Sequence, residues 1–195
     1  MEKMIRKSDN PSADWFLRLM GGPRSVQKIL KKYYGGIFKN TRLVEYIRAN
    51  GRTYRNKASA HDYSRFLYSL WKDKLSGSKE IKRLMNLPNA DRFYTSTPGV
   101  PKGTEVYDKT GTTSHLCGNM GIHVAQREDG REYPYIVVGI IEKDSKARNY
   151  SRWMRTRGDI IRHVSEITYE RISGHHKFED FESLTASSGG SEKQE

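Results

Sequence analysis

The sequence is poor in cysteine and has no long apolar run. Cys117 is the only cysteine among 195 residues, which excludes an internal disulfide and a cluster of thiolate metal ligands. The longest apolar stretch, residues 135–141, is far shorter than the about 18 residues that cross a bilayer, so we expect no membrane span. The first seven residues lack an apolar core followed by a cleavage site, and we expect no signal peptide there.

Acidic residues are also comparatively few. The chain has 35 Lys and Arg against 23 Asp and Glu, a net charge of +12 that attracts nucleic acid, anionic lipid or acidic substrates non-specifically. The basic residues are spread from Lys3 to Arg171, and the sequence has no zinc-finger spacing, RNA-binding signature or internal repeat. We therefore expect a solvated basic surface and no specific nucleic-acid partner.

The histidines do not indicate a metal site. His61, His115 and His123 lack the spacing of metal ligands, so we expect no metal and no cofactor. Cys117 is expected to be a small buried residue on a strand.

Helical periodicity characterises the first half of the chain. We predict helices from Ser12 to a stop at residues 21–23, from a cap at Ser25 to Gly35, from Ser59 to Trp71, and from Glu80 to Leu87. Residues 37–57 lack this periodicity and are predicted to form a long surface loop, which in a compact domain is often functional. The apolar stripes of the first three helices, expected to pack into a core, are Trp15, Phe16, Leu19 and Met20; Val26, Ile29, Leu30 and Tyr33; and Tyr63, Phe66, Leu67, Leu70 and Trp71.

Strand patterns follow a boundary near Asp91. Residues 104–110, 117–125 and 133–142 read as three strands of an antiparallel meander, with a hairpin turn at 128–131. A last helix is predicted over 150–172, where an apolar stripe can cover the sheet. We accordingly divide the chain into a helical part (1–92), a strand and helix part (93–172) and a disordered tail (173–195). The residues of that last stripe are Trp153, Ile160, Ile161, Val164, Ile167 and Tyr169.

Two tripeptides stand out for their chemistry. Ser8-Asp9-Asn10 precedes the first predicted helix, and Lys109-Thr110-Gly111 ends the first predicted strand. Each alone also reads as ordinary structure, namely a helix cap and a strand end. In this order and in these contexts, the pair is typical of penicillin-recognising serine enzymes, whose third signature is Ser-x-x-Lys.

From Lys7 to about Ile172 the chain resembles the C-terminal part of the class A β-lactamase-like serine hydrolases. The likeness includes Gly21-Gly22-Pro23, Thr41-Arg42-Leu43 in the long loop and the helix opening at residues 58–62. It implies an α/β fold of the α+β type, in which helices flank an antiparallel sheet, with the N-terminal part of the family fold missing. It also implies hydrolysis of a β-lactam or a D-alanyl peptide of peptidoglycan through an acyl-enzyme.

The resemblance assigns roles to the two tripeptides. Ser8 would relay a proton to the leaving nitrogen, and Asn10 would bind the amide side chain of the substrate, while Asp9 would be mainly structural. Lys109 would lend positive charge to the substrate carboxylate and to the Ser8 hydroxyl.

Three neighbouring positions complete the implied substrate site. Thr110 would hydrogen-bond the substrate carboxylate, and Gly111 would let the substrate approach the strand closely. The backbone N–H of Thr112 would supply one donor to the oxyanion.

Glu45 is the candidate base for deacylation. It lies in the long loop, where the family places a glutamate that activates water, and Asn50 could help to hold that water. No proline follows Glu45, and it comes soon after Leu43, which departs from the family pattern. The alternative is a surface carboxylate that pairs with Arg42 or Arg48.

The nucleophile is missing from its expected place, because only seven residues precede Ser8. Ser-x-x-Lys occurs at Ser25, Ser69 and Ser76, but all three follow Ser8. Ser25 would cap a helix that is non-catalytic in the family and Ser69 lies among core-facing positions, so we reject all three as nucleophiles. The chain is therefore interpreted as a fragment of a periplasmic or secreted enzyme. The other interpretation is a catalytically dead remnant that acts as a basic binding module.

Overall fold

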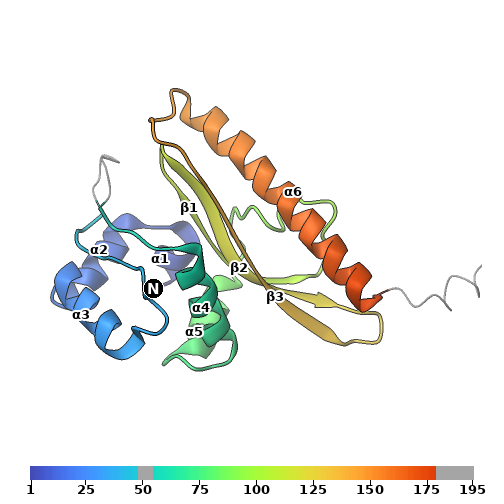
Figure 1. Ribbon diagram of the computed structural model, residues 1–195, viewed down its shortest axis with the longest axis horizontal. Coiled ribbons are helices and arrows are strands. Elements are labelled where there is room, and N and C mark those ends of the chain that lie inside the picture. Colours follow the sequence, from blue (N-terminus) through green and yellow to red (C-terminus); the bar gives the residue numbers. More distant parts are fainter. Residues whose placement is uncertain (48–54, 179–195) are drawn as a thin grey trace, which may run out of the picture.

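The computed structural model describes residues 1–47 and 55–178 (Figure 1). Five helices precede a three-stranded sheet, and a long helix follows it. Their bounds are α1 Glu2–Lys7, α2 Asn10–Leu19, α3 Pro23–Tyr34, α4 Ala60–Trp71, α5 Ser78–Met85, β1 Glu105–Thr112, β2 Leu116–Gln126, β3 Glu132–Glu142 and α6 Tyr150–His176.

The sheet is the predicted antiparallel meander, in the order β1-β2-β3. Its β2–β3 turn closes with a hydrogen bond from the Arg127 N–H to the Arg131 carbonyl (2.9 Å) and places Gly130 at φ +80°. Positive φ is accessible to glycine without steric cost, which explains why residues 128–131 give a hairpin signal. Because β1 pairs only with β2, the other edge of β1 makes no strand pairing within the described residues.

Side chains along each strand alternate between the two faces of the sheet, so both faces carry apolar residues. Helices cover both faces. On one face, Cys117 of β2 and Val137 of β3 pack with Trp153 and Ile161 of α6 and with Phe93. On the opposite face, a second core combines Ile122 of β2 with residues of α4 and α5, namely Leu67, Leu70 and Met85. Figure 1 shows α6 lying along the sheet, with the smaller helices gathered on the other side. Cys117 is fully buried, as predicted.

Helix ends follow local capping chemistry. The Ser59 side chain accepts a hydrogen bond from the Asp62 N–H and begins α4 as predicted. In contrast, α2 begins at Asn10 rather than Ser12, because Asp9 is the N-cap. The N-cap of α3 is Gly22 with Pro23 in the first turn, so the expected cap at Ser25 was wrong.

Two helical segments depart from the sequence prediction. The short helix α1 was not predicted. Helix α6 continues to His176, and Phe178 is buried beyond it, so the predicted tail begins too early at residue 173. Phe178 packs against Tyr133 of β3, with ring centroids 5.0 Å apart, which ties the end of the helix to the hairpin. The rest of that tail, from residue 179, lies outside the described residues.

Parts of the predicted apolar stripes are open to solvent. Trp15 and Leu19 of α2 are 56% and 67% exposed. On α6, Trp153 and Ile161 face the sheet, whereas Ile160, Val164 and Ile167 form a second, exposed row. Spacing alone marks both rows as apolar, but only one side of the helix can contact the sheet.

The two ends of the long loop are joined by backbone hydrogen bonds. Arg42 and Lys57 form a two-way backbone bridge, with both N–H to O distances 2.8 Å. Next to this bridge, the fully buried Asp62 carboxylate accepts hydrogen bonds from the Asn40 N–H (2.9 Å) and the Thr41 hydroxyl (2.6 Å). It also forms an ion pair with Arg65. No helix within the described ranges is long and apolar enough to span a membrane.

Candidate active site

Ser8 and Lys109 meet although 101 positions separate them. The Lys109 ammonium donates one hydrogen bond to the Ser8 hydroxyl and another to the Thr110 carbonyl (2.8 Å). Burial lowers the pKa of Lys109 and Arg92 lowers it further, while the neighbouring Asp108 carboxylate acts in the opposite direction. The structure thus places the ammonium of Lys109 against the Ser8 hydroxyl, the two groups that the family resemblance relates.

The Ser-Asp-Asn tripeptide forms the junction between α1 and α2. Ser8 has left-handed backbone geometry (φ 52°), and Asp9 caps α2 by accepting from the Ser12 N–H (2.8 Å) and hydroxyl (2.5 Å). These hydrogen bonds lower the pKa of Asp9, the one from the Ser12 hydroxyl most. Asp9 is therefore structural, as expected, and it fixes the exposed Asn10 in the first turn of α2.

In the second tripeptide and the residue after it, successive side chains point to opposite faces of the sheet. Lys109 lies opposite Met120 on the α4 face, whereas Thr112 lies opposite Cys117 on the α6 face. At Gly111 a Cβ atom would meet no other atom within 4 Å, so the chain here is open to close approach. The free edge of β1 carries the backbone of Lys109 to Thr112.

Arg92 is a functional candidate that the sequence analysis missed. Its guanidinium donates to the Thr112 hydroxyl (2.6 Å) and to the Gly118 carbonyl (3.0 Å), and the residue is only 7% exposed. Gly158 of α6 lies next to it, and a Cβ there would be in contact with the Arg92 Cδ and Nε atoms at 3.4 Å. No local periodicity marks Arg92, because its partners are 20 and 26 positions away.

Asp91 holds the turn that presents Arg92. One oxygen of its buried carboxylate accepts from the N–H groups of Phe93 (2.8 Å), Tyr94 (2.6 Å) and Thr95 (3.0 Å). These three bonds fix the backbone immediately after Arg92, while the hydrogen bonds to Thr112 and Gly118 hold its guanidinium.

Asp108 lies beside Lys109 but points to the other face of the sheet. Its buried carboxylate accepts from the side-chain amides of Asn89 (2.7 Å) and Asn119 (2.8 Å). Burial raises its pKa to about 6, although both amides and Lys109 favour the charged form. The site thus contains a carboxyl group that titrates well above its usual range.

Glu45 lies in the long loop, away from these contacts. Its carboxylate is 8% exposed and accepts from the Arg55 N–H and from Arg55 Nε (3.2 Å). The ion pair described for Glu45 is with Arg55 rather than with Arg42, and the other two expected partners, Arg48 and Asn50, lie outside the described residues. The role of Glu45 as a base stays a prediction.

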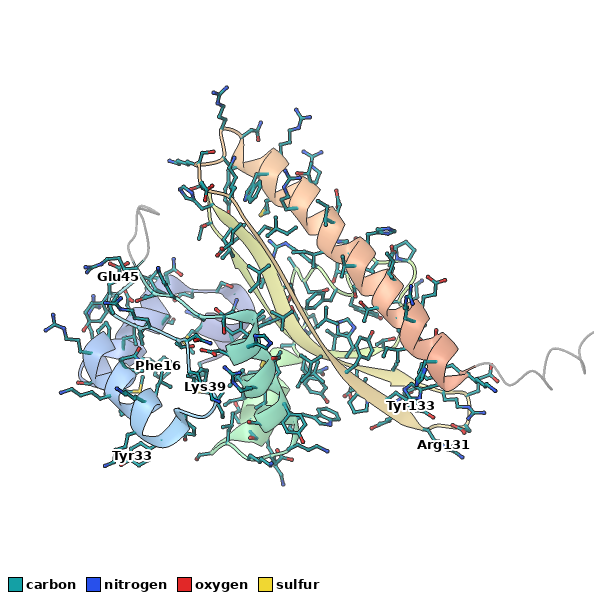
Figure 2. The ribbon with its side chains drawn as sticks, viewed as in Figure 1. Phe16, Tyr33, Lys39, Glu45, Arg131 and Tyr133 are labelled. Carbon is teal, nitrogen blue, oxygen red and sulfur yellow. The ribbon has the colours of Figure 1, made fainter. Side chains whose placement is uncertain are left out.

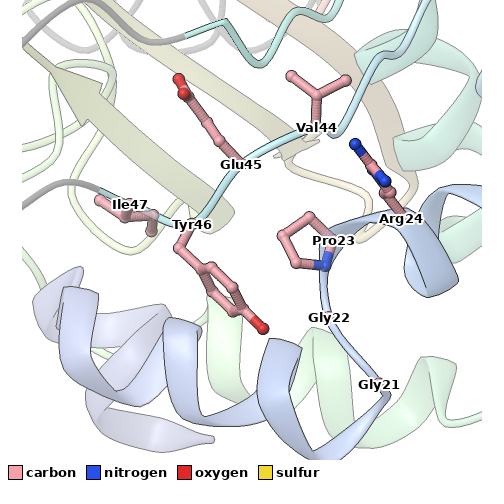
Figure 3. A pocket seen from close by; sticks show the side chains of 8 residues that line it. All are labelled: Gly21, Gly22, Pro23, Arg24, Val44, Glu45, Tyr46 and Ile47. Atoms are coloured by element: carbon pink, nitrogen blue, oxygen red, sulfur yellow. The ribbon is translucent and has the colours of Figure 1, made fainter.

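Two cavities flank this region. A cavity of about 120 Å³ lies beside Lys109 on the α4 face, lined by Tyr63, Gly118 and Ile140 among others. A larger one of about 490 Å³ lies between residues 21–24 and 44–47 (Figure 3). In that view the Glu45 carboxylate points away from Gly22 and Pro23. The first cavity, and not the larger one, adjoins the Ser8–Lys109 pair. Figure 2 likewise places Glu45 at the edge of the helical part.

Comparisons with known proteins agree with this geometry. The model of the β-lactamase enzyme family matches residues 1–172. PBP-A, whose acyl-enzyme complex with penicillin G has been solved as a mutant, is 18% identical with a TM-score of 0.69; the match covers 89% of this chain and 60% of PBP-A. No curated protein matches.

Two β-lactamase structures give similar values. A mutant of the chromosome-encoded β-lactamase of Vibrio parahaemolyticus is 20% identical (TM-score 0.66), with 87% of this chain and 63% of that one covered. A halotolerant bacterial β-lactamase is 22% identical (TM-score 0.60), with 84% and 64% covered. The chain therefore spans less than two thirds of these structures, and the likeness establishes the fold.

Proposed function

Because the chain belongs to the β-lactamase enzyme family, we propose that it supplies the substrate-holding half of a serine acyl-transfer site. The observation that carries the proposal is the contact between the Lys109 ammonium and the Ser8 hydroxyl. The reaction is hydrolysis of a β-lactam or D-alanyl peptide through an acyl-enzyme, as the resemblance implies. The whole enzyme is periplasmic or secreted in this proposal.

The substrate lies along the free edge of β1. Its carboxylate binds between Lys109 and the Thr110 hydroxyl, and Asn10 holds its amide side chain. The carbonyl oxygen points to the Thr112 N–H, which stabilises the negative charge that forms on attack. The open space at Gly111 supports this placement, because a side chain there would stand between substrate and strand.

Arg92 adds a second positive charge to this end of β1. Its hydrogen bond to the Thr112 hydroxyl fixes the residue whose N–H is the oxyanion donor. The guanidinium is held by a carbonyl and a hydroxyl, and no ion pair is described for it, so its positive charge favours an anionic group bound at this end of β1. We assign to Arg92 the role of positioning Thr112 and of adding positive charge near the substrate carboxylate.

The nucleophile in this proposal is not Ser8 but the serine of a Ser-x-x-Lys segment. That segment enters the cavity beside Lys109. That cavity of about 120 Å³ is lined by Lys109, whose ammonium donates to the Ser8 hydroxyl. As the serine attacks the carbonyl it gives its proton to the lysine of the same Ser-x-x-Lys segment, and the C–N bond breaks as Ser8 passes a proton to the leaving nitrogen. Ser8 then takes the proton held by that lysine, so the protons balance. Glu45 then activates the water that breaks the acyl bond.

A titration of the purified chain with penicillin G, followed by NMR, tests the binding half of the proposal. Amide signals of Lys109 to Thr112 should shift at millimolar ligand and should not do so in Lys109→Met. Lys102→Met, which removes a cation from an exposed turn, is the matched control and should leave the shifts intact. No shift in the unsubstituted chain would refute the proposal.

A fluorescent penicillin tests where the nucleophile resides. The chain alone should form no covalent adduct, because no serine acceptor is assigned within it. A covalent adduct would place the nucleophile inside the chain. Absence of both adduct and NMR shifts would favour the second candidate function, a non-catalytic binding module with the basic surface of this chain.

A further inference from the structure

Six cations are concentrated where α6 begins. Residues 143–157 contain a single carboxylate, Asp144, and none of the six cations forms an ion pair within the described part of the chain. The first turn of α6 has no acidic residue, so these charges lie near the positive end of the helix dipole, where cations are unfavourable. Uncompensated repulsion of this kind favours an anionic ligand. The cations, which we call the cationic rim, are Lys143, Lys146, Arg148, Arg152, Arg155 and Arg157.

The cationic rim adjoins the end of β1. The turn that follows Thr112 accepts a hydrogen bond from the Lys143 N–H at His115 (2.9 Å) and one from the Ala147 N–H at Ser114 (2.8 Å). Figure 1 shows the start of α6 beside this end of the sheet. The rim therefore continues the line that runs along the β1 edge through Lys109 and Thr112.

Part of the rim is ordered and part is free to bind. The Trp153 ring has the Lys143 ammonium 5.3 Å and the Arg157 guanidinium 5.0 Å from its centroid, which holds these two side chains. Arg148, Arg152 and Arg155 are exposed. Long exposed cations next to fixed ones form a surface that can bind several anionic groups at once.

We propose that the cationic rim binds further carboxylates of an extended peptide whose acyl end occupies the β1 edge, so that the substrate is an oligocarboxylate peptide. This inference rests on the proposed function. An extended chain advances about 3.4 Å per residue, so two or three residues past Thr112 bring peptide side chains to the turn and the rim. A compact β-lactam with one carboxylate cannot reach both places.

Fluorescence anisotropy with two labelled peptides tests this. One ends in D-Ala-D-Ala and carries two glutamates, and the other has glutamine in their place. The glutamate peptide should bind the 195-residue chain about tenfold more tightly, the effect of roughly two exposed ion pairs. The difference should vanish between about 0.1 M and 1 M salt, as the Debye length falls from about 10 to 3 Å.

Substitutions distinguish binding at the cationic rim from attraction by the overall positive charge of the chain. Arg148→Glu with Arg152→Glu should abolish the preference for the glutamate peptide. Lys28→Glu with Lys32→Glu, an equal charge change on exposed residues of α3, should preserve it. Equal affinity for the two peptides, an equal loss in both double variants, or stronger displacement by tripolyphosphate than by the unlabelled glutamate peptide would each overturn the proposal.

Lys109→Met distinguishes this inference from the proposed function. If both hold, the variant weakens the two peptides alike and leaves their ratio unchanged. If the rim binds carboxylates but β1 is no substrate site, the variant alters neither peptide, and only the rim variant reduces the ratio. The second pattern refutes the shared site, and a ratio of one in the unsubstituted chain refutes the rim.

Discussion

The Arg92 guanidinium lies 2.6 Å from the Thr112 hydroxyl, to which it donates a hydrogen bond at the end of β1. The same group satisfies the Gly118 carbonyl on β2. One side chain from the turn after α5 thus joins two strands next to the proposed oxyanion donor, and its removal should affect stability and ligand binding together.

Arg92→Met should lower the free energy of unfolding by about 1–3 kcal/mol, because the Gly118 carbonyl loses its charged donor in a buried place. Urea unfolding measures the change. Arg155→Met on the exposed side of α6 is the control and should stay within about 0.5 kcal/mol of the parent. Equal stability of the two variants would contradict the assigned role of Arg92.

Two glycines of α6 offer a matched test of the packing around Arg92. Gly to Ala inside a helix ordinarily stabilises by about 0.5–1 kcal/mol, which we expect for Gly174→Ala, where nothing lies within 4 Å of the added Cβ. In Gly158→Ala the Cβ contacts Arg92 and Arg162 at 3.4 Å, so the gain should be reduced or lost. Thermal unfolding compares the two, and an equal gain at both sites would show that Arg92 does not need this space.

Asp108 and His123 should make opposite contributions to stability between pH 4 and 6. Burial raises the pKa of Asp108 from 3.8 to about 6, so its protonated form stabilises the fold at low pH and this contribution disappears as pH rises through about 6. Burial lowers the pKa of His123 from 6.5 to about 4, while Asp91 opposes the shift. Its neutral form is therefore stabilising above pH 6.5, and stability is lost as pH falls through about 4.

Asp108→Asn should expose the contribution of His123. Relative to the parent, the variant should gain stability as pH rises from about 4 to 6, by up to about 3 kcal/mol, since a pKa difference of one is 1.36 kcal/mol. Urea unfolding at several pH values measures this. A parent-minus-variant difference that is constant over this range would show that Asp108 titrates normally.

Glu45→Gln should block deacylation if Glu45 is the base. In a form of the protein that carries the nucleophile, penicillin should then leave a long-lived acyl-enzyme visible by mass spectrometry. Arg55→Gln removes the guanidinium partner but keeps the carboxylate, and should slow turnover much less. Similar losses of turnover and of stability in both variants would instead assign Glu45 a structural role in the loop.

The sheet and α4 were predictable because their signals are local. Period-two alternation, a glycine turn and a Ser59 cap each act within a few residues, and β1, β2, β3 and the start of α4 follow them closely. The short helix α1 has only Met4 and Ile5 as partly buried apolar residues, too few to form a periodic pattern.

The burial of individual side chains and the contacts between residues far apart in the sequence could not be predicted from local sequence patterns. Leu19 and Val164 are apolar at helical spacing yet exposed, because burial is decided by what packs on a helix and not by its own sequence. Arg92 was missed for the same reason. The pairing of Ser8 with Lys109 was expected only through the family resemblance, since nothing local links positions 101 residues apart.

The buried Asp62 carboxylate has a consequence for how the long loop can change. It gathers Asn40, Thr41, Ser59 and Arg65, residues on both sides of the Arg42–Lys57 bridge. These four partners of Asp62, like the bridge itself, lie outside residues 43–56. Substitutions within residues 43–56 should therefore leave the hydrogen bonds of Asp62 in place, while Leu43 and Ile47 are tied separately to Gln27 of α3 and Asp14 of α2.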